Sequence, residues 1–181
     1  IHRDMVGGGW LRLRPGAVTD DTQMSLVLGR SILEHGDVIP VAVAEAFSAW
    51  MRTKPVDIGN TVRRGIASYR RTGHPEMPEN TFDAGNGACM RCLPIALYFC
   101  HASDQALCEA SRQQAHTTHN NPLADAGTEA VLKMLVRLLN GSDKSEIQEL
   151  ADLLVKEYPE YRYDKRRAEN PSGYIVHTLQ V

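Results

Sequence analysis

The chain has 181 residues, a mass of 20.1 kDa and a formal net charge of −2 at pH 7. Its 43% hydrophobic and 23% charged residues exclude a disordered chain, and the charge balance gives no electrostatic reason to expect nucleic-acid binding. No run of about 18 apolar residues is present, which excludes a transmembrane helix within this sequence. A chain of this size forms one compact domain or a large part of one.

Helical periodicity dominates the chain, and no run of alternating apolar and polar residues predicts a strand. Residues 1–18, 73–87 and 159–173 are rich in glycine, turn residues or polar residues and predict irregular structure. The segments between them predict about eight helices, which cover roughly residues 19–34, 40–53, 57–72, 88–102, 104–118, 121–140, 145–158 and 174–181. The sequence therefore predicts an all-α fold, organised as a single compact multi-helix domain.

Local signals place several helix ends. Thr19 is expected to cap the first helix, and Pro40 is expected to open the second. Pro94 lies inside the predicted fourth helix, where it either kinks the helix or occupies its first turn. Ser145 and Gln148 have the spacing of a capping box and predict the start of the seventh helix.

The four cysteines favour reduced thiols, because a chain of this size does not need disulfide cross-links. Cys89 and Cys92 form a C-x-x-C pair whose spacing would place both on one face of the predicted fourth helix. No second C-x-x-C pair and no flanking βαβ pattern accompany them, so structural packing is favoured over zinc binding or redox chemistry. No secretory signal peptide is recognisable, and a cytoplasmic location is expected.

The segment Thr19-Asp20-Asp21-Thr22 places two adjacent carboxylates and two hydroxyls in the first turn of the first predicted helix. One interpretation is capping, in which Thr19 caps the helix and the two aspartates favour its positive end. The other is a site for a hard cation such as Mg²⁺ or Mn²⁺, which prefers carboxylate and hydroxyl oxygens. Two carboxylates alone bind such a cation weakly, so the second interpretation requires further oxygen ligands from elsewhere.

Several short motifs, in the same order along the chain, resemble those of the ADP-ribosylglycohydrolase family. Residues 16–24 (GAVTDDTQM) resemble the family's first metal motif, and residues 85–91 (GNGACMR) are similar to its Gly-Asn-Gly-x-x-Met-Arg stretch. Residues 118–119 (TH) resemble a third motif, and residues 57–61 (DIGNT) match a bacterial branch that removes ADP-ribose from nitrogenase iron protein. The resemblance covers most of the chain, and the motifs are specific as a set rather than singly.

The resemblance implies a domain of orthogonally packed helices with metal-dependent hydrolase activity. The implied reaction cleaves the N-glycosidic bond between ADP-ribose and an arginine side chain, and water is added at the anomeric carbon through an oxocarbenium-like transition state. The resemblance also implies a binuclear Mn²⁺ or Mg²⁺ site in which Thr19, Asp20 and Asp21 supply part of the ligands. The implied partners are an ADP-ribosylated protein, which is nitrogenase iron protein in the bacterial branch, and a regulatory PII-type signalling protein.

By the same resemblance, Asp57 is the candidate catalytic carboxylate, acting as a general base or orienting the opened ribose. Its position alone is explained equally well by an N-terminal cap on the third predicted helix. Asn60 lies about one turn later on the same face, so both side chains would point into one cleft and Asn60 would bind substrate. The alternative for Asn60 is a polar surface position.

Gly85-Asn86-Gly87 precedes the fourth predicted helix, so its backbone N–H groups would approach a pyrophosphate closely at the helix end. The alternative is an ordinary turn. The resemblance implies that His119 contacts the phosphates or the ribose of the substrate.

The family's metal site also uses a glutamate from an early Gly-Asp-x-x-Gly segment and an Asp-x-Asp-Thr motif from a late helix, and neither is found in the matching part of residues 1–181. We therefore expect these residues to form a partial ADP-ribosylglycohydrolase domain, truncated at both ends, that is inactive by itself. Two alternatives stay open: a hydrolase of another ADP-ribose linkage, and a non-catalytic family member that binds ADP-ribose or has a structural role.

Overall fold

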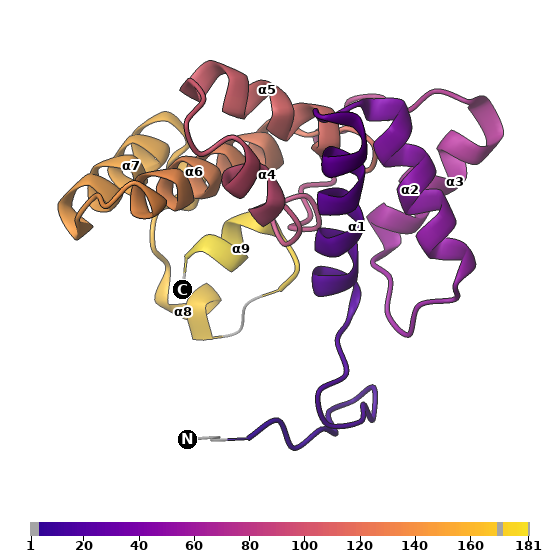
Figure 1. Ribbon diagram of the computed structural model, residues 1–181. Helices are drawn as coiled ribbons and strands as arrows, with labels where there is room; N and C mark the ends of the chain where they lie inside the picture. The colour runs from indigo at the N-terminus through magenta and orange to yellow at the C-terminus, as the bar shows by residue number, and fades with distance from the viewer. Residues whose placement is uncertain (1–3, 170–171, 181) are drawn as a thin grey trace.

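The computed structural model describes residues 4–169 and 172–180, and it confirms an all-α fold without strands in these residues (Figure 1). The helices are α1 (Asp20–His35), α2 (Pro40–Arg52), α3 (Asn60–Thr72), α4 (Leu93–Tyr98), α5 (Asp104–Ala115), α6 (Pro122–Leu139), α7 (Lys144–Glu157), the 3₁₀ helix η1 (Pro159–Tyr161), α8 (Lys165–Glu169) and α9 (Ile175–Leu179). Among the helices of these two stretches, none is long and apolar enough to cross a membrane.

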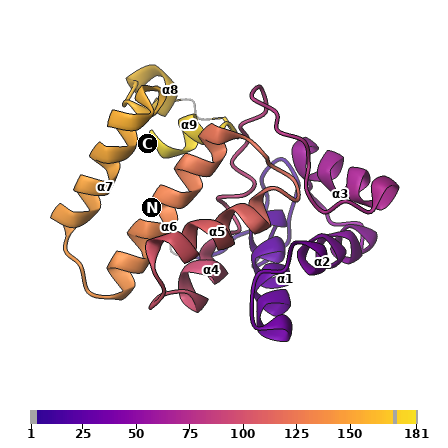
Figure 2. The same cartoon turned by 90° about the horizontal axis from the view of Figure 1, so that it is seen from above.

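Helix α1 lies between two groups of helices. It packs against α2, which in turn packs against α3, and it also packs against α4. The second group is organised by α6, which contacts α4, α5, α7 and α9. Figure 2 shows α2 and α3 on one side of α1 and the group around α6 on the other. Segments that are distant in the sequence are thereby brought together around α1.

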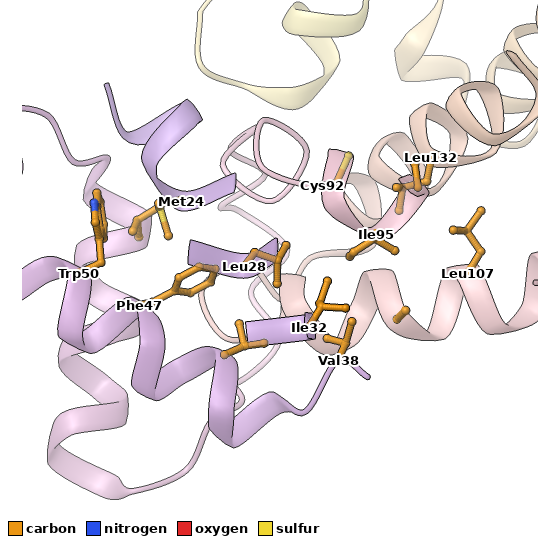
Figure 3. Packing of buried hydrophobic residues seen from close by; sticks show 14 of the residues in the cluster. Met24, Leu28, Ile32, Val38, Phe47, Trp50, Cys92, Ile95, Leu107 and Leu132 are labelled. Atoms are coloured by element: carbon orange, nitrogen blue, oxygen red, sulfur yellow. The ribbon is translucent and has the colours of Figure 1, made fainter. Parts of the chain in front are cut away.

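The inner face of α1 carries much of the main hydrophobic core. Met24, Leu28 and Ile32 recur at helical spacing, so they form one stripe, and all three are buried. Figure 3 shows this stripe beside Phe47 and Trp50 of α2, which belong to the same cluster. Complete burial of one such side chain contributes about 1.5–3 kcal/mol to folding. Helix α1 is thus anchored along its length, and this fixes the position of its first turn.

The predicted extents of α1, α2 and α6 are confirmed closely. Gly36 ends α1 in the left-handed conformation, with φ 71°, and Pro40 opens α2 as predicted. The start of α7 differs from the prediction. The Asp143 carboxylate accepts hydrogen bonds from the backbone N–H groups of Ser145 and Glu146, so it caps the helix in place of the predicted capping box.

Helix α4 is much shorter than the predicted helix over residues 88–102. A helix that began earlier would need a hydrogen bond from the nitrogen of Pro94, which carries no hydrogen. The helix therefore starts at Leu93, and Pro94 occupies its first turn, one of the two predicted positions. Cys89 lies in the turns before α4 and Cys92 is the N-cap residue of α4, so neither lies on a face of the helix, and both are free thiols.

The C-terminal segment is more helical than predicted. Residues 159–173 contain η1 and α8, and the helix expected after Gly173 is present as α9. The predicted end of that helix at Val181 lies outside the described residues. Tyr161, Ile175 and Val176 form a second, smaller core against α6.

Substitution of Gly65 in α3 tests how closely this helix approaches the chain after α5. A Cβ atom placed on Gly65 would lie 2.6 Å from Thr118 Cα and 2.7 Å from the Thr117 carbonyl oxygen, which are backbone atoms that cannot move aside alone. Gly65→Ala is expected to lower the free energy of unfolding by about 1–3 kcal/mol, measured by urea denaturation.

The matched control is Gly29→Ala in α1, where the nearest atom to a new Cβ is Pro94 Cβ at 3.4 Å, an ordinary contact. This substitution should be neutral or stabilising by up to about 1 kcal/mol, because alanine favours a helix over glycine. Equal effects of the two substitutions would contradict the close packing of α3.

Candidate active site

A pocket of about 330 Å³ lies beside the first turn of α1. It is lined by every site candidate named from the sequence except Thr19. These lining residues are Asp20, Asp21, Asp57, Asn60, Gly85, Asn86, Gly87 and His119. They come from α1, from the start of α3 and from loops that are distant in the sequence, so the fold is what brings them together.

The acidic side of the pocket consists of Asp20, Asp21 and Asp57. Asp20 is buried, and its Oδ2 accepts a hydrogen bond from the backbone N–H of Gly59 at 3.3 Å, which links α1 to the loop before α3. Burial raises the pKa of Asp20 above its ordinary value, and the negative charges of Asp57 and Asp21 raise this pKa further. The ionised carboxylates therefore repel one another in the folded protein.

Thr19 has the extended backbone expected of a capping residue, but its side chain makes no hydrogen bond to the helix backbone. Its hydroxyl instead donates to Asp21 Oδ2 at 2.9 Å. The prediction is right about the position of the cap and wrong about the capping side chain. The hydroxyl donates its hydrogen to a charged acceptor, which makes a strong hydrogen bond, but its oxygen accepts no backbone N–H as a cap would.

The charge of the pocket fits a hard divalent cation. No lysine or arginine is among its lining residues, so the repulsion between the carboxylates is not offset by a cationic side chain there. In the part of the chain that the structure describes, no group of three or more Asp, Glu, His or Cys side chains can hold a metal ion by itself. Asp20 and Asp21 thus offer carboxylate oxygens of the kind such a cation prefers, whereas Thr19 does not line the pocket. Metal binding by these three residues stays a prediction.

Asp57 and Asn60 line the pocket in a different way from the prediction. Helix α3 begins at Asn60 with Gly59 as its N-cap, so Asp57 neither caps the helix nor shares a helical face with Asn60. Asp57 lies in the preceding loop, where its Oδ1 accepts a hydrogen bond from the backbone N–H of Ile58 at 2.9 Å. This bond fixes the carboxylate at the pocket without help from a helix.

The Gly85-Asn86-Gly87 segment is held by the chain before and within α9. The backbone N–H of Asn86 donates to the Gly173 carbonyl at 2.8 Å, and Asn86 Nδ2 donates to Thr178 Oγ1 at 3.0 Å. The expected helix end directly after Gly87 is wrong, because α4 begins only at Leu93. Contact of this segment with a pyrophosphate stays a prediction.

Gly85 and Gly87 make room for the ring of His119. A Cβ atom on Gly87 would lie 2.6 Å from His119 Cε1, and one on Gly85 would lie 3.1 Å from His119 Nε2. Neither glycine has a positive φ, so the requirement is for space rather than for a special backbone conformation. The ring therefore rests on this loop, with Nε2 and Cε1 next to the glycines.

The imidazole of His119 is only 2% exposed, and its Nδ1 lies 2.8 Å from Thr118 Oγ1. Burial lowers the pKa of His119 to about 3, with smaller contributions from the positive charges of Arg91 and Arg64. His119 is therefore neutral at physiological pH. It can offer a phosphate or a ribose oxygen a hydrogen bond, but not a positive charge.

Sequence reasoning assigned no role to Arg91, although it ends one of the motifs. Its side chain is completely buried and donates to Gln114 Oε1, to the Gln114 carbonyl and to Thr118 Oγ1, while its guanidinium lies 4.4 Å from the centre of the Phe47 ring. Burial lowers the pKa of Arg91 to about 9, which leaves it charged at neutral pH. The sequence feature that could have indicated this buried position is an arginine that stands among apolar residues.

Comparisons with known proteins agree with one another. The family model described as ADP-ribosylglycohydrolase matches residues 2–180. The chain is 44% identical to an ADP-ribosyl-(dinitrogen reductase) glycohydrolase of Rhodospirillum rubrum, an alignment that covers 100% of this chain and 61% of the relative. It is 32% identical to an ADP-ribosylarginine hydrolase of Pseudomonas putida strain GB-1, covering 98% of this chain and 52% of the relative.

A solved structure described as an ADP-ribosylglycohydrolase-related protein complex has the same fold. The two superpose with a TM-score of 0.80 at 31% sequence identity, covering 98% of this chain and 62% of that chain. The chain thus spans between 52% and 62% of the length of these proteins.

Asp20→Asn is expected to stabilise the metal-free protein at pH 7. The folded state raises the pKa of Asp20 above its ordinary value of 3.8. The stability that this raised pKa contributes is fully present below pH 3.8, and it is lost as the pH rises through the raised pKa. The variant cannot ionise, and its amide oxygen can still accept from Gly59. Its urea midpoint should exceed that of the parent at pH 7, and the difference should close towards pH of about 4.

Asp4→Asn, at an exposed position that does not line the pocket, is the control and should leave the midpoint unchanged. A midpoint for Asp20→Asn at or below the parent's at pH 7 would show that the buried carboxylate is not under electrostatic strain.

Proposed function

The chain belongs to the ADP-ribosylglycohydrolase family, and from this premise we propose that the protein is a metal-dependent hydrolase of ADP-ribosyl-arginine on a modified protein. The observation that carries the proposal is the convergence of Asp20, Asp21 and Asp57 on a pocket that also contains Asn60 and His119. An acidic pocket with neutral hydrogen-bonding groups suits a sugar whose C–N bond must be hydrolysed.

The substrate class also explains why a cation is needed. The pyrophosphate of ADP-ribose is negatively charged, and carboxylates without a lining lysine or arginine would repel it. Thr19, Asp20 and Asp21 would hold a Mn²⁺ or Mg²⁺ ion, in a binuclear site if further ligands join them. The ion would supply positive charge and orient the ribose hydroxyls.

The remaining residues have distinct proposed roles. Asp57 Oδ1 accepts a hydrogen bond from the Ile58 N–H, and its Oδ2 has no hydrogen-bond partner among the described residues. We propose that Oδ2 would take a proton from the attacking water. Asn60 would bind ribose hydroxyls through its amide. His119, which is neutral, would donate a hydrogen bond rather than exchange a proton.

The names of the relatives support the linkage and the target. The Rhodospirillum protein is named for ADP-ribosylated dinitrogen reductase and the Pseudomonas protein for ADP-ribosylarginine. We therefore propose arginine as the modified residue and dinitrogen reductase, the nitrogenase iron protein, as the target.

The test is release of ADP-ribose from arginine-modified dinitrogen reductase by the protein in its natural length, with and without Mn²⁺. We expect metal-dependent release, and a rate for Asp57→Asn lower by about 10²- to 10⁴-fold, because a carboxylate that accepts a proton is lost. Asp152→Asn, an exposed change on α7, is the matched control and should retain the parent's rate.

A well-folded, metal-supplied protein that releases nothing from the arginine linkage would overturn the proposal. Release from a serine-linked substrate under the same conditions would reassign the linkage. Binding of ADP-ribose without turnover of any substrate would favour a non-catalytic family member.

A further inference from the structure

Three buried side chains form a chain of hydrogen bonds that ends at the pocket. Arg91 Nη2 donates to Thr118 Oγ1 at 2.8 Å, and Thr118 Oγ1 lies 2.8 Å from His119 Nδ1. Arg91 is 0% exposed, and Thr118 and His119 are each 2% exposed, so water does not replace these bonds. The direction of each bond can therefore be worked out from donors and acceptors alone.

An arginine guanidinium only donates, so the Thr118 oxygen must accept from Arg91. The single hydroxyl hydrogen of Thr118 is then available for His119 Nδ1, which must accept it. In the opposite arrangement Nδ1 would carry the hydrogen and the Thr118 hydroxyl hydrogen would have no partner. A buried hydroxyl hydrogen without an acceptor costs about 1–3 kcal/mol.

We propose that Arg91 and Thr118 are positioning residues, which hold His119 in the tautomer with its hydrogen on Nε2 and so present a neutral donor to the pocket. Nε2 faces the Gly85–Gly87 loop, and it has no hydrogen-bond partner among the residues that the structure describes. The natural partner of this N–H group is an oxygen of the bound ADP-ribosyl group, an assignment that rests on the proposed function.

The buried charge of Arg91 strengthens this arrangement. Donation from a guanidinium polarises the Thr118 hydroxyl, which in turn makes the Nε2–H of His119 a better donor. Gln114 supplies two further oxygens to Arg91 but no negative charge, so the field of the guanidinium at His119 is not cancelled by a partner carboxylate. The same field opposes protonation of the ring, which leaves proton transfer in the pocket to a carboxylate.

The tautomer can be measured directly by nitrogen-15 NMR of the histidine rings in the natural-length protein, with His119→Gln used to assign the signal. We expect hydrogen on Nε2 and no protonation of the ring at pH 5. Thr118→Ser should preserve this pattern, whereas Thr118→Val, which keeps the shape and removes the hydroxyl, should shift the signal towards the other tautomer. Hydrogen on Nδ1 in the parent would overturn the proposal.

The second readout is the affinity for ADP-ribose, measured by calorimetry with Mn²⁺ present. Thr118→Val should weaken binding about tenfold, the equivalent of one good hydrogen bond, and Thr118→Ser should restore it. Thr128→Val is the matched control, because Thr128 is equally buried but bonds only the Ala124 carbonyl within α6. It should bind like the parent.

The outcomes separate the two proposals. If Thr118→Val keeps the tautomer and the affinity of the parent, the positioning role is wrong. If the NMR pattern is as expected but no variant and no parent protein binds ADP-ribose, the positioning role stands and the proposed function fails. Should Thr118→Val not fold, the tautomer of the parent and of Thr118→Ser still decides the question.

Discussion

The buried guanidinium group of Arg91 is the constraint on which the geometry of the pocket depends. Taking a cation out of water costs several kcal/mol unless the protein replaces the lost solvation. Here the replacement comes from the oxygens of Gln114 and Thr118 and from the ring of Phe47. Phe47 belongs to α2, Gln114 to the end of α5 and Thr118 to the chain just after α5, whereas Arg91 belongs to the turns before α4. An arrangement of these segments that removed these oxygens from Arg91 would leave more of its charge without solvation, so the polar contacts favour the observed arrangement.

Hydrophobic burial and electrostatic repulsion oppose each other within a single helix. The stripe of Met24, Leu28 and Ile32 anchors α1, and the same helix carries Asp20 and Asp21 in its first turn. The core therefore holds carboxylates close to Asp57 although their charges disfavour this position. A site of this kind is preorganised for positive charge, because the cost of bringing the ligands together is met during folding rather than during binding.

The helix ends were predictable where the residues that determine them are local in the sequence. The site was only partly predictable, because it depends on contacts between residues that are distant in the sequence. Gly36 and Pro40 act within one turn of their own position, so the end of α1 and the start of α2 could be read from the sequence. Asp57 lies outside α3 because Gly59, rather than Asp57, is the N-cap of that helix. Helix α4 starts late because Pro94 has no N–H to donate. The spacing of residues alone does not decide either helix start. The link from Arg91 to Thr118 joins residues 27 positions apart, and no periodic pattern in the sequence encodes it.

The contact between Gly87 and His119 limits the order in which substitutions can accumulate. A methyl group at position 87 and an imidazole at position 119 would overlap in space. Whether a substitution is tolerated at either position therefore depends on the residue at the other, and not on its neighbours in the sequence. An alanine at position 87 becomes acceptable only after the ring at position 119 has been replaced by something smaller, and that first step removes the pocket's neutral donor. Positions 87 and 119, which are 32 residues apart in the sequence, are therefore sterically coupled, and a substitution at either one alters the pocket.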